Sequence, residues 1–174
     1  MLNRPFLLIL IYLRKKISSG LAWLWAAGFV LAIDRLVKLW IVEHLVVGEP
    51  LHVLSIFNLT LAYNTGAAFS FLSSASGWQN LFLGGLAIIV SIAILVWLSR
   101  LSIHDYCLSV SFSLILGGAL GNVWDRVIYG RVIDFFDFHF GDWHFAIFNV
   151  ADSAICIGAL MMLLHWVVYP NRRY

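Results

Sequence analysis

Residues 78 to 98, WQNLFLGGLAIIVSIAILVWL, form a long apolar run without one charged side chain. An α-helix rises about 1.5 Å per residue, so a run of this length reaches across the roughly 30 Å hydrocarbon core of a bilayer. The run therefore predicts a transmembrane helix, and it decides the fold class. We expect an all-α membrane protein.

Three more apolar runs of similar length lie on either side of the first, at residues 21–42, 108–129 and 148–168. Composition agrees with a lipid environment, because 62% of the 174 residues are hydrophobic and 11% are charged, against roughly 45–50% and 25% in soluble domains. The sequence therefore predicts one polytopic membrane domain over residues 1–174, built as a four-transmembrane-helix bundle.

The distribution of lysine and arginine predicts the orientation of the bundle. An even number of spans places both termini on one side of the membrane. The basic residues gather at the two termini and in the short loop between the second and third spans: Arg4, Arg14, Lys15, Lys16, Arg100, Arg172 and Arg173. This side is expected to be cytoplasmic. Residues 1–18 are interpreted as a cytoplasmic arm and not a signal peptide, because their apolar part is too short to span and precedes its basic residues.

The two segments on the opposite side, residues 43–77 and 130–147, hold most of the acids and histidines, with Arg131 as their lone fixed cation. Residues 51–61, LHVLSIFNLTL, are rich in β-branched and aromatic residues and partly alternate in polarity. Such a pattern is typical of strands. We therefore expect a small extracytoplasmic β-element between the first two helices.

Several charged or amide side chains stand inside predicted spans, where they are costly and by default mark a functional site. Asp34 and Lys38 are four residues apart, so they share a helical face and could form an ion pair. A purely structural anchor is an equal alternative for that pair. In the third span Asn122, Asp125 and Arg126 share another face. For Asp125 and Arg126 we favour a structural tie to a neighbouring element.

The third span also contains small residues. Gly117, Gly118 and Gly121 provide a contact face, and Gly117 with Gly121 forms a GxxxG motif. Such motifs let two helix backbones approach closely. We interpret the glycines as packing residues.

Two aspartates near the outer boundary suggest catalysis. Asp134 lies in the apolar context VIDFF, and Asp152 opens the fourth span. Because one short loop joins the last two helices, both carboxylates can meet at one membrane depth. Two such groups in a low-dielectric site cannot both ionise easily, so one acts as general acid and the other as general base. This pair could activate water on a peptide carbonyl. An N-cap or interfacial role for each aspartate remains an alternative.

Other catalytic chemistries lack their motifs. There is no HExxH, no GxSxG and no glycine-rich phosphate loop. Cys107 and Cys156 lack metal-binding spacing and are expected in the core, while His139 and His144 are expected at the interface. We therefore predict no metal and no cofactor. The net charge of +2 does not indicate nucleic-acid binding.

Two other classes of function stay open on these residues alone. One is a proton- or ion-coupled carrier, in which Asp34, Asp125, Asp134 and Asp152 would line a pathway across the membrane. The other is a non-catalytic assembly factor that uses the GxxxG face and the outer strands for docking. Neither explains why Asn64, Asn122 and Asn149 accompany the acids.

Taken together, five motifs resemble those of the lipoprotein signal peptidases (signal peptidase II). They cover most of the chain, in the family's order. The motifs are Asp34-Arg35-Leu36-Val37-Lys38, Tyr63-Asn64-Thr65-Gly66-Ala67-Ala68-Phe69, Gly121-Asn122-Val123-Trp124-Asp125-Arg126, Val132-Ile133-Asp134-Phe135 and Phe148-Asn149-Val150-Ala151-Asp152-Ser153.

The resemblance implies an aspartic endopeptidase of the bacterial inner membrane, with its active site near the outer face. Its implied substrates are diacylglyceryl-modified prolipoproteins, cleaved before the lipidated cysteine, and its other partners are membrane lipids. Asp134 and Asp152 correspond to the catalytic pair. The remaining matched positions imply substrate-binding or supporting residues, namely Asn64, Gly66, Asn122, Asp125, Arg126, Asn149, Asp34 and Lys38.

The resemblance also implies that the outer strands form a cradle on the membrane surface and that a nearby loop closes over the substrate. One position departs from the pattern. Arg35 stands where the family usually has glutamine, and its long guanidinium is expected to extend to an interface.

Overall fold

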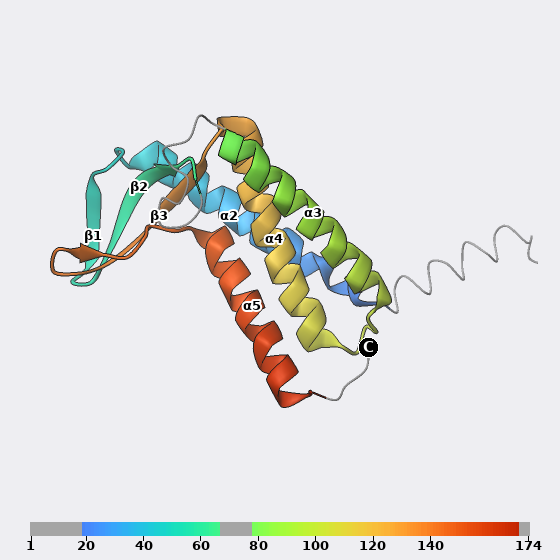
Figure 1. Ribbon diagram of the computed structural model, residues 1–174. Helices are drawn as coiled ribbons and strands as arrows, with labels where there is room; N and C mark the ends of the chain where they lie inside the picture. The colour runs from blue at the N-terminus through green and yellow to red at the C-terminus, as the bar shows by residue number, and fades with distance from the viewer. Residues whose placement is uncertain (1–18, 67–77, 171–174) are drawn as a thin grey trace, which may run out of the picture.

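Figure 1 shows the computed structural model, a helix bundle with a small sheet at one end. The structure describes residues 19–66 and 78–170. The arm predicted at residues 1–18 lies outside the described residues.

Within the described residues, four long helices follow a short 3-10 turn, η1 (Gly20–Trp23). They are α2 (Leu24–His44), α3 (Trp78–Arg100), α4 (Tyr106–Tyr129) and α5 (Val150–Val168). Each is long and apolar enough to cross a membrane, with η1 counted as part of the first span. The prediction of four long apolar helices is confirmed, with ends that differ from the predicted ones by a few residues. The chain is a multi-pass membrane protein.

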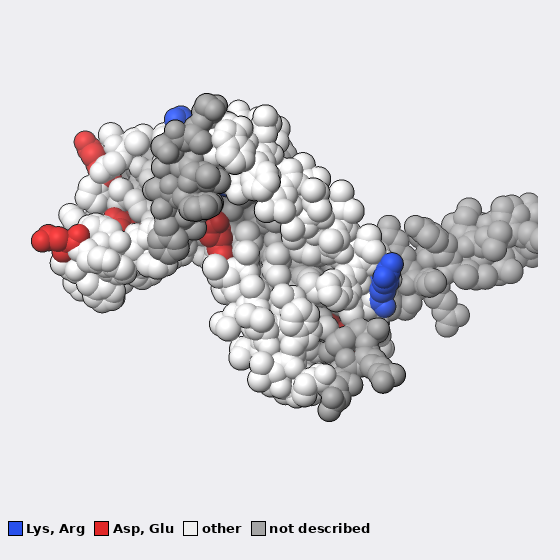
Figure 2. Space-filling view, viewed as in Figure 1, with Lys and Arg blue, Asp and Glu red and all other residues white. Residues whose placement is uncertain are grey.

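Helix α4 is the centre of the bundle. It packs against α2, α3 and α5, and it is far more buried than the other three spans. In Figure 1 it lies between α3 and α5. The space-filling view agrees with a lipid environment, because the visible sides of the bundle are almost uncharged whereas acidic side chains gather mainly at the sheet end (Figure 2).

Glycines let α4 approach two neighbours at once. A Cβ atom at Gly117 would lie 2.6 Å from the carbonyl oxygen of Ala27 on α2. A Cβ at Gly118 would collide with the carbonyl oxygen of Ala151 on α5. The small residues thus form contacts on two sides of the helix, and the backbones of α2, α4 and α5 are held close together.

The sheet is antiparallel, with the order β1-β2-β3-β4. Strands β1 (Pro50–Leu54) and β2 (Phe57–Asn64) lie between α2 and α3 in the chain, as predicted. Strands β3 (Val132–Phe140) and β4 (Trp143–His144) come from the segment between α4 and α5 and were not predicted. The four phenylalanines of β3 favour a strand. A strand in such a short connection between helices can be predicted only when its pairing partner, here β2, is known.

Besides the core within the helix bundle, a separate hydrophobic core joins this sheet to the helices. Ile41 of α2, Leu61 of β2, and Ile133 and Phe135 of β3 form a buried cluster. Side chains alternate along a strand, so Asp134 lies on the other face of β3 from these two residues. Even there its exposed fraction is only 3%.

The glycine contacts give a testable prediction. Gly117→Ala should lower the free energy of unfolding by about 1–3 kcal/mol, because the new methyl group forces α2 and α4 apart. Thermal unfolding in detergent measures the change. Gly84→Ala on α3 is the control, since a Cβ there meets nothing within 4 Å. Equal losses for the two variants would contradict close packing at Gly117.

Candidate active site

Asp152 is positioned by the start of α5. Asn149 is the N-cap residue, and its side chain accepts a hydrogen bond from the Asp152 backbone N–H at 2.8 Å, while the Asp152 carboxylate accepts one from the Asn149 N–H at 3.3 Å. This capping box fixes the carboxylate to the first turn. The helix begins two residues later than predicted because Phe148 pairs with Phe136 of β3.

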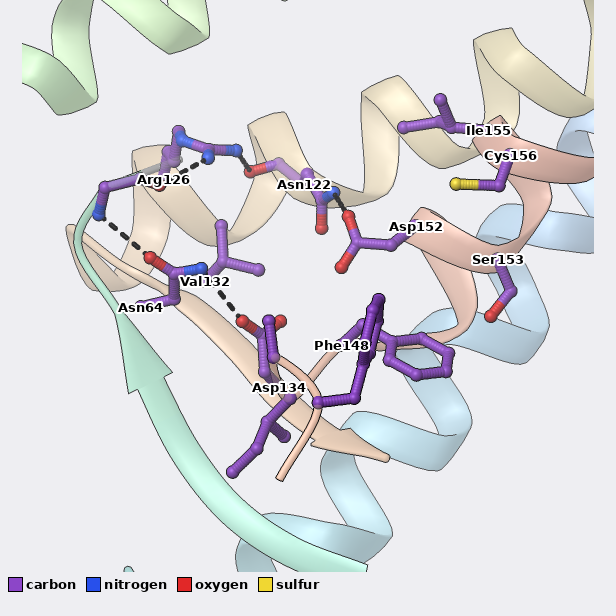
Figure 3. A pocket seen from close by; sticks show the side chains of 14 residues that line it. Asn64, Asn122, Arg126, Val132, Asp134, Phe148, Asp152, Ser153, Ile155 and Cys156 are labelled. Atoms are coloured by element: carbon purple, nitrogen blue, oxygen red, sulfur yellow. Dashed lines mark hydrogen bonds between the residues drawn. The ribbon is translucent and has the colours of Figure 1, made fainter. Parts of the chain in front are cut away.

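Asp134 and Asp152 both line a cavity of about 430 Å³. Figure 3 shows them projecting from β3 and from the first turn of α5. The other polar lining side chains include Asn64, Asn122 and Arg126. The apolar wall is formed by residues 145–148 and one face of α5, including Ile155 and Cys156.

Neither cysteine is a core residue, contrary to the prediction. Cys156 is exposed and Cys107 is half-buried. Cys156 follows Asp152 by one helical turn, so its side chain lies on the face of α5 that lines the cavity.

Asparagine amides hold both carboxylates. Asn64 Nδ2 donates to Asp134 Oδ2 at 3.0 Å, and Asn149 Nδ2 donates to Asp134 Oδ1 at 2.7 Å. Asn122 Nδ2 donates to Asp152 Oδ1 at 2.7 Å. Asn149 Nδ2 also lies 3.2 Å from Asn122 Oδ1. A chain of amides therefore connects the two acids and fixes the direction in which each carboxylate points.

A buried ion cluster lies beside these amides. Lys38 Nζ is 2.8 Å from Asp34 Oδ2, 2.7 Å from Asp125 Oδ2 and 3.4 Å from Asn122 Oδ1. Lys38, Asp34 and Asp125 are 0% exposed. Arg35 Nη2 lies 2.6 Å from Asp125 Oδ1, so the cluster holds two cations and two carboxylates. The sequence suggested an interface for the Arg35 guanidinium, but it did not reveal this pairing with a buried carboxylate.

The same cluster binds backbone groups of the site. Asp34 Oδ1 accepts a hydrogen bond from the Ala151 N–H at 3.0 Å, one of the N–H groups in the first turn of α5 that lack a partner within the helix. Asp125 Oδ2 accepts from the Ile133 N–H at 3.3 Å, next to Asp134. The ion cluster therefore orients the segments on both sides of the cavity.

Arg126 is the cation of the cavity. Its Nη1 donates to the Asn122 carbonyl oxygen at 3.3 Å and its Nη2 to the Gly66 carbonyl oxygen at 3.4 Å. Asn64 Oδ1 accepts from the Gly66 N–H at 2.9 Å. Gly66 thus connects an amide that holds Asp134 with the guanidinium at the cavity wall.

Burial, and then the nearby charge of Asp152, raise the pKa of Asp134 from 3.8 to about 6. The hydrogen bonds from Asn64 and Asn149 oppose this rise without cancelling it. Asp137, on the same strand, behaves in the opposite way. Its burial is outweighed by hydrogen bonds from His144 (2.7 Å) and Thr60 (2.9 Å), which lower its pKa. Asp134 is therefore the strand acid that can carry a proton near neutral pH.

Comparisons with known proteins match this arrangement to one family. The family model for signal peptidase (SPase) II matches residues 26–168. A lipoprotein signal peptidase of Coxiella burnetii is 46% identical over 159 residues, covering 91% of this chain and 98% of that protein. One from Yersinia enterocolitica is 46% identical over 156 residues, covering 90% and 92%. The chain belongs to the signal peptidase II family.

Solved structures agree with this membership. A chain described as "Bacterial membrane enzyme structure by the in meso method at 2.3 A resolution" is 30% identical, with a TM-score of 0.78, over 88% of this chain and 92% of that chain. A second bacterial membrane enzyme, at 1.9 Å resolution, is also 30% identical and has a TM-score of 0.74. Since the signal peptidase II family is one of aspartic peptidases, this chain is an enzyme of that type.

The structure sorts the predicted site residues of this family member into two groups. One group lies at the cavity or directly behind it: Asn64, Gly66, Asn122, Arg126, Asp134, Asn149 and Asp152. The other is the buried ion cluster with Asp34, Lys38 and Asp125. This clustering disfavours a carrier, because Lys38 and Arg35 neutralise two of the four acids that would have lined its pathway.

Sequence reasoning missed two features of the site. The ion pair of Arg35 with Asp125 joins residues far apart in the chain, and only the packing of α2 on α4 reveals it. Of the wall at residues 145–148, residues 145–147 were assigned to the outer segment and Phe148 to the fourth span, so their common role in lining the cavity was missed. In the described ranges 19–66 and 78–170, no cluster of three or more histidine, cysteine or acidic side chains could hold a metal ion.

The environment of Asp134 predicts its titration. Its protonated carboxyl band in the infrared should disappear as pH rises through about 6. In Asp152→Asn the midpoint should fall, because the neighbouring negative charge is gone, but it should stay above 3.8 because burial remains. Asp134→Asn assigns the band by removing it. A midpoint unchanged by Asp152→Asn would show that the two carboxyl groups do not interact.

Proposed function

We propose that Asp134 and Asp152 are the catalytic pair with which this aspartic peptidase removes signal peptides from diacylglyceryl-modified prolipoproteins, cutting before the lipidated cysteine. The observation that carries the proposal is the raised pKa of Asp134 opposite Asp152 in one cavity. Family membership supports the substrate class, because the similar proteins are lipoprotein signal peptidases.

In the proposed reaction Asp134 carries the proton and Asp152 is the base. Asp152 removes a proton from a water molecule, whose oxygen forms a bond to the scissile carbonyl carbon. Asp134 donates a hydrogen bond to the carbonyl oxygen, and its proton then passes to the leaving amine as the carbon–nitrogen bond breaks. The asparagines keep both carboxylates aimed at the cavity throughout, so little reorganisation is needed.

Arg126 and Gly66 are proposed to hold the substrate backbone. The Arg126 guanidinium lines the cavity with its Nε free of any acceptor among the described residues. A peptide carbonyl can accept from such a donor. The Asp34, Lys38 and Asp125 cluster is proposed to act as a support, since its contacts reach the catalytic segments through their backbone N–H groups.

The apolar wall of the cavity supports a lipid-modified substrate. Ile155 and Cys156 continue the wall along α5, whose next turns are largely exposed apolar residues such as Ile157 and Leu160. Helices α3 and α5 both pack on α4. We propose that the signal helix lies beside these spans and that the acyl chains remain in the surrounding membrane.

We further propose the orientation of this single domain in the bacterial inner membrane. The excess of lysine and arginine at both termini supports cytoplasmic ends. The sheet would then form an extracytoplasmic cradle with the active site near the outer face. A tag inserted at Gly141, in the β3–β4 turn, should be labelled from outside the cytoplasm. If the tag were protected from labelling in intact spheroplasts, the sheet would lie on the cytoplasmic side and the proposed orientation would be wrong.

The catalytic proposal predicts that Asp134→Asn and Asp152→Asn each lower cleavage by at least about 10²–10⁴-fold, because an amide can neither accept nor supply the required proton. Release of the signal peptide from a lipidated precursor by purified enzyme measures the loss. Asp142→Asn, an exposed acid in the β3–β4 turn, is the matched control and should cleave normally. Near-normal turnover by either dyad variant, in correctly inserted protein, would exclude the pair.

Substrate choice gives a second prediction. A diacylglyceryl group would hold the cysteine at the interface, and a misplacement of about 1 Å can cost roughly a hundredfold in rate. One precursor, with and without prior lipid transfer, should therefore differ in cleavage rate by about that factor under identical detergent conditions. Equal rates would show that the lipid does not position the scissile bond.

A further inference from the structure

A second cavity of about 410 Å³ lies on another side of the ion cluster. It is formed by α2, the end of α4 and strands β2 and β3, and it shares no lining residue with the cavity of the aspartates. The polar residues that line it are Arg35, Lys38, Glu43, Tyr63, Tyr129 and Arg131.

Two arginines bring unused donors to this cavity. Arg131 is exposed, its guanidinium lies 3.5 Å from the centre of the Tyr63 ring, and it pairs with no carboxylate within residues 19–66 and 78–170. Arg35 uses Nη2 to bind Asp125, but its Nε is buried and has no acceptor among the described residues. A buried donor without a partner is costly, and a native structure rarely contains one without a reason.

One cation of this cavity has no ion-pair partner among the described residues. Lys38 and Arg35 pair with Asp34 and Asp125 in the ion cluster, whereas Arg131 forms no ion pair within that part of the chain. Glu43 also lines the cavity, but it is not paired with Arg131. The guanidinium of Arg131 and the free Nε of Arg35 are therefore available to an anion.

The surroundings select an anion attached to a lipid. Leu39 and Val42 line the cavity and are 58% and 43% exposed on the lipid-facing side of the spans. Tyr129 is the last residue of α4, and Tyr63 of β2 lies against Arg131, which follows that helix end. Tyrosines at the ends of spans are typical of the membrane–water boundary. Arginine binds phosphate oxygens with two parallel hydrogen bonds and matches them better than lysine does.

We propose that this cavity binds the phosphodiester of a phospholipid headgroup, with Arg35 and Arg131 as its ligands. The acyl chains of the lipid extend along Leu39 and Val42 on α2. The site does not depend on the catalytic proposal, because neither Arg35 nor Arg131 lines the cavity of the two aspartates.

Native mass spectrometry of the full chain in neutral detergent tests the site, with phosphatidylethanolamine, phosphatidylglycerol and a diacylglycerol of the same acyl chains as probes. Both phospholipids should bind, and the diacylglycerol should bind at least about tenfold more weakly, since it lacks the charge-assisted hydrogen bonds. Arg131→Gln should weaken phospholipid binding by about tenfold. Arg100→Gln is the control. Arg100 is the last residue of α3, at the end of the bundle away from the sheet, so this variant should leave phospholipid binding unchanged.

Arg35→Gln should also weaken phospholipid binding about tenfold, but it removes a partner of buried Asp125 and can destabilise the fold. Arg131 is exposed, so Arg131→Gln decides the outcome. Equal affinities for diacylglycerol and phospholipid, or normal binding by Arg131→Gln, would overturn the proposal. Displacement of the phospholipid by equimolar glycerophosphate or inorganic phosphate would also overturn it, because the site would then accept a free anion and not a lipid headgroup.

Discussion

The contact of the Lys38 ammonium with two carboxylates is the interaction on which the rest of the structure depends. Asp34 and Asp125 lie on different helices, and each also accepts a hydrogen bond from a backbone N–H next to one of the two aspartates of the cavity. Removing one member of such a buried cluster leaves an uncompensated charge, at a cost of about 3–5 kcal/mol. One ammonium therefore joins α2 to α4 and, through its two partners, sets the positions of α5 and β3.

The acids around the proposed active site differ in how they are surrounded. Asp34 and Asp125 face cations at close range, and Asp137 accepts two short hydrogen bonds from side chains of the sheet. Asp134 has only neutral amides as close partners and faces another carboxylate. The surroundings of Asp134 thus differ from those of the neighbouring acids, and they let Asp134 hold a proton near neutral pH.

Much of this could be predicted from the sequence, and the limits have physical causes. Long uncharged runs reveal spans, and motif order reveals the family, because both are local properties of the chain. Strand β3 escaped prediction because its hydrogen bonds go to β2, about seventy residues away. The ion pair of Arg35 was missed because its partner Asp125 is 90 residues further along the chain. The grouping of Asn64, Asn122 and Asn149 around two acids was implied by resemblance, whereas their donor directions needed coordinates.

The capping box at the start of α5 has a consequence for resistance to inhibitors. Asn149 caps the helix, holds Asp134 and lies beside Asn122, while Asp152 both closes the capping box and faces the cavity. A compound that binds Asp152 would contact a residue that also maintains a helix end. A mutation of Asp152 that evades the compound would then also break the capping box, and loss of a cap costs about 1 kcal/mol. Escape at this position would therefore lower the stability of the membrane domain.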